Sequence, residues 1–286
     1  MQYAVRCRDE ICAGGDPASN EDLIGRTQAA AWVIDGVSGM DGRTLTAEAS
    51  DAVWLAKTLD TALRHEFASS QQDVDAAFER ISSRISLAFS GIAEKRCGDD
   101  RMACPSACLA LLSVGDRRLE ISYIGDCRVI AELPEDGLCV ASDMRIERFE
   151  SLILKDLIDL IKREPNAEPK WALRERFRET RGFLNRPDGY WVVHPTLEWL
   201  RGLRKTAAPA FEGQTALIVS DGFYRLVNPF GAHADRSLFA AAKQHGLKAL
   251  LETLRELEAR ESIEDYPRVK RHDDASACLI QIAACD

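Results

Sequence analysis

The sequence lacks the features that mark secreted and membrane-spanning proteins. It has nine cysteines, an odd number, and no C-x-x-C pair among its 286 residues. Secreted disulfide frameworks need paired cysteines, so this usage favours reduced thiols in a cytoplasm. Residues 1–10 are charged and have no apolar core, which argues against a signal peptide. Because no run approaches the ~20 apolar residues of a membrane helix, we expect a cytoplasmic protein without a membrane partner.

The sequence is also short of positive charge. Its 37 Lys and Arg face 46 Asp and Glu, which gives a formal net charge of -9 at pH 7. Proteins that bind nucleic acids usually carry a basic surface, so an RNA or DNA partner is disfavoured. The phosphate-binding patterns G-x-x-x-x-G-K-[ST] and G-x-G-x-x-G are absent as well. Nucleic-acid binding and nucleotide binding by these routes therefore have no support in the sequence.

Hydrophobic patterning predicts strands grouped into hairpins and separated by helices. Residues 3–7 alternate as in a strand, and apolar runs compatible with strands occupy residues 29–34, 107–114, 119–124, 128–133, 190–193, 215–220 and 275–283. Apolar residues at a spacing of 3.6 predict helices over residues 53–67, 74–92, 146–162, 171–183 and 247–257. Isolated β-α-β units do not dominate this order. We therefore expect a single α+β domain over residues 1–286, with antiparallel sheets and helices packed on their outer faces.

Acidic residues gather at the ends of the predicted strands. Five such places occur along the chain: Glu21-Asp22, Asp35-Gly36, Gly125-Asp126, Asp221-Gly222 and Asp273-Asp274. Carboxylates at strand ends can converge at one rim of a sheet, and hard cations such as Mg²⁺ and Mn²⁺ prefer oxygen ligands. A single Asp-Gly is chiefly a turn signal. The prediction of a metal centre therefore depends on the ordered set.

Five segments carry these acidic residues and a sixth, S-A-C-L-A, lies among them. Their order is S-N-E-D at 19–22, V-I-D-G-V-S-G at 33–39, S-A-C-L-A at 106–110, Y-I-G-D-C-R at 123–128, L-I-V-S-D-G-F at 217–223 and D-D-A-S at 273–276. Together they resemble the motifs of the type-2C metal-dependent protein phosphatases, in a divergent, bacterial-like form. The resemblance implies a four-layer α-β-β-α sandwich of two antiparallel sheets flanked by helices. It also implies a serine/threonine phosphatase whose partner is a phosphorylated protein.

The resemblance implies roles for the acidic residues of the first two motifs. Asp35 would bridge two metal ions, and the carbonyl oxygen of Gly36 would bind one of them. Glu21 would hold that same ion, directly or through water, and Asp22 would orient water molecules at the metals. A water molecule activated by the two ions would attack phosphorus, so no cysteine or serine nucleophile is expected.

The later motifs complete the expected cofactor set. Asp221 and Asp274 would hold the second ion, and Asp126 matches the family position that serves a third, weaker one. The resemblance therefore implies two Mn²⁺ or Mg²⁺ ions, with a place for a third at Asp126. The sequence does not choose between these metals, and it leaves the oligomeric state open.

One departure from the family pattern concerns phosphate binding. Bacterial relatives usually carry an arginine three residues before the asparagine of the first motif, where this chain has Pro17. The sequence offers Arg6, Arg8 and Arg26 as substitutes and does not choose among them. The residue that contacts the phosphate is therefore left open.

Two further departures affect proton transfer and the last motif. Val37 follows the first Asp-Gly, where many relatives have histidine as a proton donor, and Ala275 stands where asparagine is usual. The carboxylate set is nevertheless complete. Two alternatives to a protein phosphatase stay open, a non-catalytic or regulatory member of the same fold and a phosphatase of a small phosphorylated metabolite.

Residues 144–209 lie where the family carries its variable flap. This segment is rich in charge and contains Trp171, Trp191 and Trp199. One interpretation is that it selects the substrate. The other is that the tryptophans complete a local core, because large aromatic side chains are usually well buried.

Overall fold

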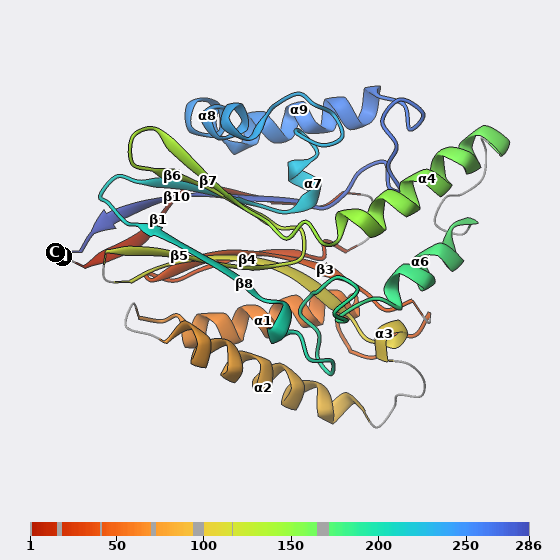
Figure 1. The fold of residues 1–286 in the computed structure, drawn as a ribbon, viewed down its shortest axis with the longest axis horizontal. Helices are drawn as coiled ribbons and strands as arrows, with labels where there is room; N and C mark the ends of the chain where they lie inside the picture. The colour runs from red at the N-terminus through yellow and green to blue at the C-terminus, as the bar shows by residue number, and fades with distance from the viewer. Residues whose placement is uncertain are drawn as a thin grey trace.

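The structure is a computed structural model that describes residues 2–15, 19–40, 42–69, 73–93, 100–115, 117–164 and 172–285. Two antiparallel sheets of five strands each pack face to face, and helices cover the outer face of each sheet (Figure 1). The expected α+β class and the four-layer α-β-β-α sandwich are therefore confirmed.

The first sheet joins the two ends of the chain. In spatial order its strands are β1 (Tyr3–Ala13), β10 (Ala275–Ala284), β9 (Thr215–Val219), β6 (Arg128–Leu133) and β7 (Gly137–Ala141). The second sheet consists of β2 (Asp22–Arg26), β3 (Ala30–Val37), β4 (Ser106–Val114), β5 (Arg118–Ile124) and β8 (Arg204–Pro209), also in spatial order. Strand β1 pairs with β10 from Tyr3 to Ala13, so segments that lie far apart in the sequence run side by side.

The helices form the two outer layers and one end of the molecule. Helices α1 (Asp51–Glu66) and α2 (Val74–Ala93) cover the second sheet, and α8 (Asp235–His245) and α9 (Leu247–Arg260) cover the first (Figure 1). The short α7 (Asp221–Tyr224) follows β9 directly. Helices α3 (Asp100–Ala103), α4 (Glu147–Arg163) and α6 (Arg174–Arg181) lie at one end of the sandwich (Figure 1).

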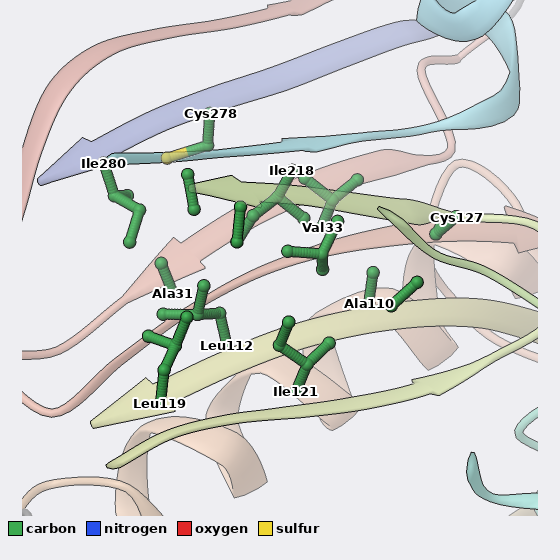
Figure 2. Packing of buried hydrophobic residues seen from close by; sticks show 14 of the residues in the cluster. Ala31, Val33, Ala110, Leu112, Leu119, Ile121, Cys127, Ile218, Cys278 and Ile280 are labelled. Atoms are coloured by element: carbon green, nitrogen blue, oxygen red, sulfur yellow. The ribbon is translucent and has the colours of Figure 1, made fainter. Parts of the chain in front are cut away.

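The strands read as continuous apolar runs because both of their faces are buried. On β3, Ala31 and Val33 belong to the core between the sheets, whereas Trp32 and Ile34 pack with the side chains of α1 and α2. Figure 2 shows the core between the sheets, where Val33 from the second sheet faces Ile218 from the first. All nine residues of β4 are buried. Strands with two covered faces lose the alternation that marks a half-exposed sheet.

Two sequence expectations need correction. Residues 190–193 do not form a regular strand but contribute two isolated bridges, Leu184 with Tyr190 and Ala107 with Val193. The segment 144–209 contains α4, α6 and the 3₁₀ turn Leu200–Gly202, but its last six residues are β8, which pairs with β5 in the second sheet. The end of this segment is therefore part of the sandwich.

The tryptophans of this segment lie in a core. Trp199 is fully buried and packs edge to face on Phe78 of α2, with ring centroids 6.2 Å apart. Trp191 is buried in the same cluster, and Trp171 lies outside the described residues. These positions support the interpretation that Trp191 and Trp199 complete a core. In the described part of the chain, no helix is long and apolar enough to cross a membrane.

Candidate metal centre

The predicted acidic residues come from strand ends at one rim of the sandwich. Asp22 at the start of β2 lies directly opposite Asp35 of β3 in the strand register. Asp126 lies in the turn that connects β5 to β6, and Asp221 follows β9 directly. Like charges on directly opposed residues destabilise a sheet. The pairing of Asp22 with Asp35 therefore needs a proton or a cation between the two carboxylates.

The carboxylates of this rim raise one another's pKa. Burial raises the pKa of Asp35 well above its usual range, and the charges of Asp22 and Asp221 add to the effect. Burial, with the charge of Asp221, raises the pKa of Asp22 to about 8. The pKa of Asp221 rises to about 6 through burial and the charge of Asp126. Such mutual shifts mark side chains that lie close together in a site of low polarity.

Several of these oxygen atoms have no protein partner. Both carboxylate oxygens of Asp22 and Oδ1 of Asp126 are buried without a hydrogen bond from any described residue. Ligand atoms of Asp35, Asp126 and Cys127 lie within 4.8 Å of one another. A buried carboxylate without a partner is costly, and a divalent cation offsets that cost. The oxygen-rich donor set therefore fits hard cations such as Mn²⁺ or Mg²⁺.

Two glycines shape the backbone at this rim. A Cβ on Gly36 would lie 2.9 Å from the carbonyl oxygen of Glu21 and 3.0 Å from Cβ of Ala52, so a side chain does not fit there. Gly125 has a φ of +76°, the left-handed conformation that glycine adopts without strain. It places Asp126 at the turn between the two sheets.

Glu21 is fixed by hydrogen bonds that the sequence did not reveal. Its backbone carbonyl accepts from the amide of Gly36 at 3.2 Å. Its side-chain Oε1 accepts from the hydroxyl of Ser38 at 3.0 Å, and Ser38 Oγ also accepts from the amide of Ala52, at the start of α1. Ser38 therefore positions Glu21 beside Gly36.

The side chains of Asp273 and Asp274, the last acidic pair, make different contacts. Asp274 Oδ1 accepts from the amide of Gly15 at 2.9 Å, and its Oδ2 accepts from the amide of Glu21 at 2.8 Å. The charge of Asp273, by contrast, raises the pKa of Asp221. A Cβ on Gly222 would lie 1.9 Å from the carbonyl oxygen of Asp274 and 3.2 Å from Cβ of Asp273, so the chain at both residues packs closely against the start of α7.

The ligand role expected for Asp274 stays a prediction, because each of its carboxylate oxygens keeps a second lone pair after it accepts one hydrogen bond. Both of its oxygens already accept hydrogen bonds from backbone amides, so it ties the chain before β2 to the start of β10. The charge of Asp274 contributes to the raised pKa of Asp22, as that of Asp273 does for Asp221, so both residues of the pair lie close to the centre.

Comparisons with solved structures identify the fold of the chain. No family model and no curated protein matches the sequence. The solved structure of the *Mycobacterium tuberculosis* serine/threonine phosphatase PstP/Ppp superposes with a TM-score of 0.59 at 15% identity, covering 99% of this chain and 100% of that one. The serine/threonine phosphatase Stp1 from *Staphylococcus aureus* gives 0.56 at 14% identity, covering 99% and 98%. The PPM Ser-Thr phosphatase MsPP from *Mycobacterium smegmatis* gives 0.52 at 15% identity, covering 98% of each chain.

The chain has the PPM phosphatase fold. The type-2C resemblance of the sequence is thereby confirmed at the level of the fold, over nearly the whole chain. One further structure of this fold, the catalytic domain of PstP, is a complex with 2 manganese ions, and it superposes with a TM-score of 0.57 at 16% identity, covering 99% and 100%.

Within this PPM fold, α4 adds a carboxylate that no motif predicted. Burial raises the pKa of Glu150 to about 9, and the charges of Asp126 and Asp221 contribute to the shift. Glu150 therefore belongs to the electrostatic surroundings of the centre. It comes from the variable segment, where the sequence offers no spacing by which it could have been found.

The three arginines that the sequence offered as phosphate contacts lie on β1 and β2. Arg8 donates to Gln281 at 2.9 Å, and Arg26 forms an ion pair with Glu10. Arg6 lies opposite Gln281 on β10, seven residues beyond Asp274 and so about 23 Å along the strand. Pro17 itself lies outside the described residues.

Two basic residues contact the acidic rim instead. Arg225 forms ion pairs with Asp273 at 2.6 Å and with Glu258 at 3.0 Å. Lys270 Nζ lies 2.9 Å from Asp273 Oδ1, and its side chain stays 54% exposed. Burial lowers the pKa of Lys270, but the charges of Asp273 and Asp35 outweigh it and hold the pKa above its usual value. Lys270 is therefore a charged, accessible cation at the edge of the centre.

Proposed function

We propose that the chain is a metal-dependent phosphatase that hydrolyses phosphoserine or phosphothreonine in proteins. The observation that carries the proposal is the convergence of Asp22, Asp35, Asp126 and Asp221 at one rim, with buried oxygens that have no partner among the described residues. The PPM fold supports the reaction class. The manganese complex of PstP, a protein of the same fold, supports a centre for two Mn²⁺ or Mg²⁺ ions.

Different residues of the rim would bind each of the two ions. Asp35 would bridge both ions, and the Gly36 carbonyl and Glu21 would serve the first. Asp221 would serve the second ion with a carboxylate of the Asp273-Asp274 pair, of which Asp274 is the residue implied by the family resemblance and Asp273 acts on the pKa of Asp221. Asp126, with Glu150 close by, offers carboxylates for a third ion. When bound, such ions lower the pKa of water and offset the charge of phosphoryl oxygens.

The protein's own side chains would hold water and phosphate at this rim. Both oxygens of Asp22 are free of protein hydrogen bonds among the described residues, so they can accept hydrogen bonds from water and orient it. Lys270 carries an exposed ammonium group beside Asp273, and it is the cation that we assign to the substrate phosphate. Val37 is 46% exposed and has no proton to give. The leaving oxygen would therefore take its proton from water.

One observation favours the alternative of a non-catalytic, regulatory protein. Asp273 is already paired with Arg225 and Lys270, which offset its charge without a metal ion. If these ion pairs replace the second ion, the centre would hold a single ion or none. The two functions differ in whether bound metal produces turnover.

Turnover by metal-loaded protein separates these functions. Protein treated with chelator and then loaded with Mn²⁺ is assayed on a phosphothreonine peptide and on an aryl phosphate. We expect Mn²⁺-dependent hydrolysis that falls on the order of 100-fold in Asp35→Ala and Asp221→Ala, the scale on which single transition-state contacts act. Asp188→Ala, at an exposed turn, is the matched control. Equal rates for the wild type and the two centre variants would refute the proposal, and a preference for the aryl phosphate would favour a small metabolite as substrate.

A further inference from the structure

A second cluster of metal-ligating side chains lies on the first sheet, away from the acidic rim. Ligand atoms of Cys7, Glu10 and Cys278 all lie within 4.8 Å of one another. Cys7 Sγ is 3.5 Å from Glu10 Oε2. Cys278 stands four residues beyond Asp274 on β10, about 13 Å along the strand. The cluster is therefore separate from the centre described above.

A β-bulge brings these three side chains together. Residues 7 and 10 of a regular strand would point to opposite faces, because side chains alternate with a period of two. In β1 the pairing shifts between Cys7 and Asp9, so that Cys7 opposes Ile280 and Glu10 opposes Cys278. The extra residue puts both Cys7 and Glu10 on the same face of the sheet as Cys278.

The cluster sits at the boundary between the core and solvent. Cys278 is fully buried in the core between the sheets, and Figure 2 shows it beside Ile280 on β10. Cys7 is half-buried and packs against that core, whereas Glu10 is exposed. An ion could therefore reach the two sulfur atoms from the Glu10 side.

The charges around the cluster suit a divalent ion. Two thiolates and a carboxylate around a doubly charged cation leave one negative charge, and Arg26 of β2 supplies a positive charge through its ion pair with Glu10. A hydrogen bond from the Cys278 thiol lowers the pKa of Cys7 to about 6, and the charge of Arg26 acts in the same direction. A metal ion binds cysteine as the thiolate, so its binding would displace the protons of the two thiols.

The donor types select the metal. Sulfur ligands favour Zn²⁺ and similar ions over the hard cations Mg²⁺ and Mn²⁺, which prefer oxygen alone. Three protein ligands with a solvent-facing side match a tetrahedral zinc site that leaves its fourth position to water. We propose that Cys7, Glu10 and Cys278 bind one zinc ion, which joins β1 to β10 independently of any phosphatase activity.

Cobalt substitution tests this site separately from the carboxylate centre. Co²⁺ bound by thiolates gives a sulfur-to-metal charge-transfer band in the near ultraviolet, whereas Co²⁺ bound by oxygen atoms does not. Full-length protein is titrated with Co²⁺ under a reductant that does not bind metals. We expect the band in the wild type, its loss on adding Zn²⁺, and its loss in Cys7→Ser and Cys278→Ser. Because Cys278 is buried, circular dichroism of each variant checks the fold, and the half-buried Cys7 decides the result if Cys278→Ser does not fold.

Four control variants make the outcome specific. Cys139→Ser changes a partly buried cysteine on β7, at the far edge of the same sheet, and should keep the band. Asp35→Ala and Cys127→Ser, which change the acidic rim and the thiol beside it, should also keep the band, even if they abolish hydrolysis. Glu10→Gln should weaken Co²⁺ binding and leave the band in place at high Co²⁺. Absence of the band in reduced wild type, or its persistence in Cys7→Ser, would overturn the proposal.

Discussion

Replacing Asp22 by asparagine should stabilise the metal-free protein. Asp22 is only 8% exposed, lies opposite Asp35 and has no hydrogen bond to its carboxylate oxygens from any described residue. Its pKa is about 8 in the folded protein against an ordinary value of 3.8 for aspartate. A group with a raised folded pKa binds its proton more tightly in the folded state. Its contribution to stability is therefore complete below about pH 4 and is lost as the pH rises toward 8.

The pKa values set the size of this effect. Each pKa unit corresponds to about 1.4 kcal/mol, so the ionisable group costs on the order of 5 kcal/mol at pH 8 relative to pH 4. Asparagine removes the charge but leaves a buried amide, which costs about 1–3 kcal/mol. We expect Asp22→Asn to be more stable than the wild type by roughly 2–4 kcal/mol at pH 8, and to be equally stable or less stable by up to about 2 kcal/mol at pH 4.5.

Urea unfolding in the presence of chelator measures this difference. The free energy of unfolding of both proteins is compared at pH 4.5 and pH 8, with Asp188→Asn as an exposed control. The advantage of Asp22→Asn should grow with pH, and added Mn²⁺ should stabilise the wild type more than the variant. If the variant is no more stable than the wild type at pH 8 without metal, Asp22 does not stand in the crowded, desolvated group of carboxylates that we describe.

Three other changes probe the centre. Lys270→Ala should raise KM for a phosphopeptide about tenfold or more, because it removes a charged contact, and Lys270→Arg should restore part of the loss; an unchanged KM would contradict this role. Ser38→Ala should weaken Mn²⁺ binding about 10–100-fold, the usual effect of removing a side chain that orients a ligand, as measured by calorimetry; equal affinity would mean that Glu21 needs no such support. Asp273→Asn should lower Mn²⁺ affinity more than Asp274→Asn, whose amide oxygen can still accept from the backbone, and the reverse order would identify Asp274 as the ligand.

Much of the fold followed from the sequence because its strands are covered on both faces. The runs that became β3, β4 and β9 are continuously apolar, and such runs bounded by turn residues are typical of buried strands. Strand β8, with the exposed Arg204 and Lys205, gave no such signal because it is an edge strand with partly exposed side chains. Edge pairing depends on the neighbouring strand, here β5, and not on local pattern.

The candidate site was predictable in its acidic residues and not in their neighbours. The order of the Asp-Gly and Asp-Asp pairs along the chain pointed to Asp35, Asp126 and Asp221. Which of Asp273 and Asp274 binds the second ion depends on the direction of the chain before β10, which the sequence does not encode locally. Glu150 and Lys270 reach the rim from segments without a shared motif.

The cluster of Cys7, Glu10 and Cys278 could not be predicted from the sequence either. Cys7 and Cys278 are separated by nearly the whole chain, and they meet only because β1 pairs with β10 and carries a bulge. No spacing in the sequence marks such a site. The pairing of β1 with β10 and the one-residue bulge in β1 bring the cysteines of this site together.

Anomalous diffraction from a crystal soaked in Mn²⁺ tests the central claim most directly. The account predicts two manganese peaks at the rim, both in contact with Asp35, one of them beside the Gly36 carbonyl and the other beside Asp221 and the Asp273-Asp274 pair. A crystal with Mn²⁺ in solution and no peak within reach of Asp35 would contradict it, as would peaks found only at other acidic residues of the surface.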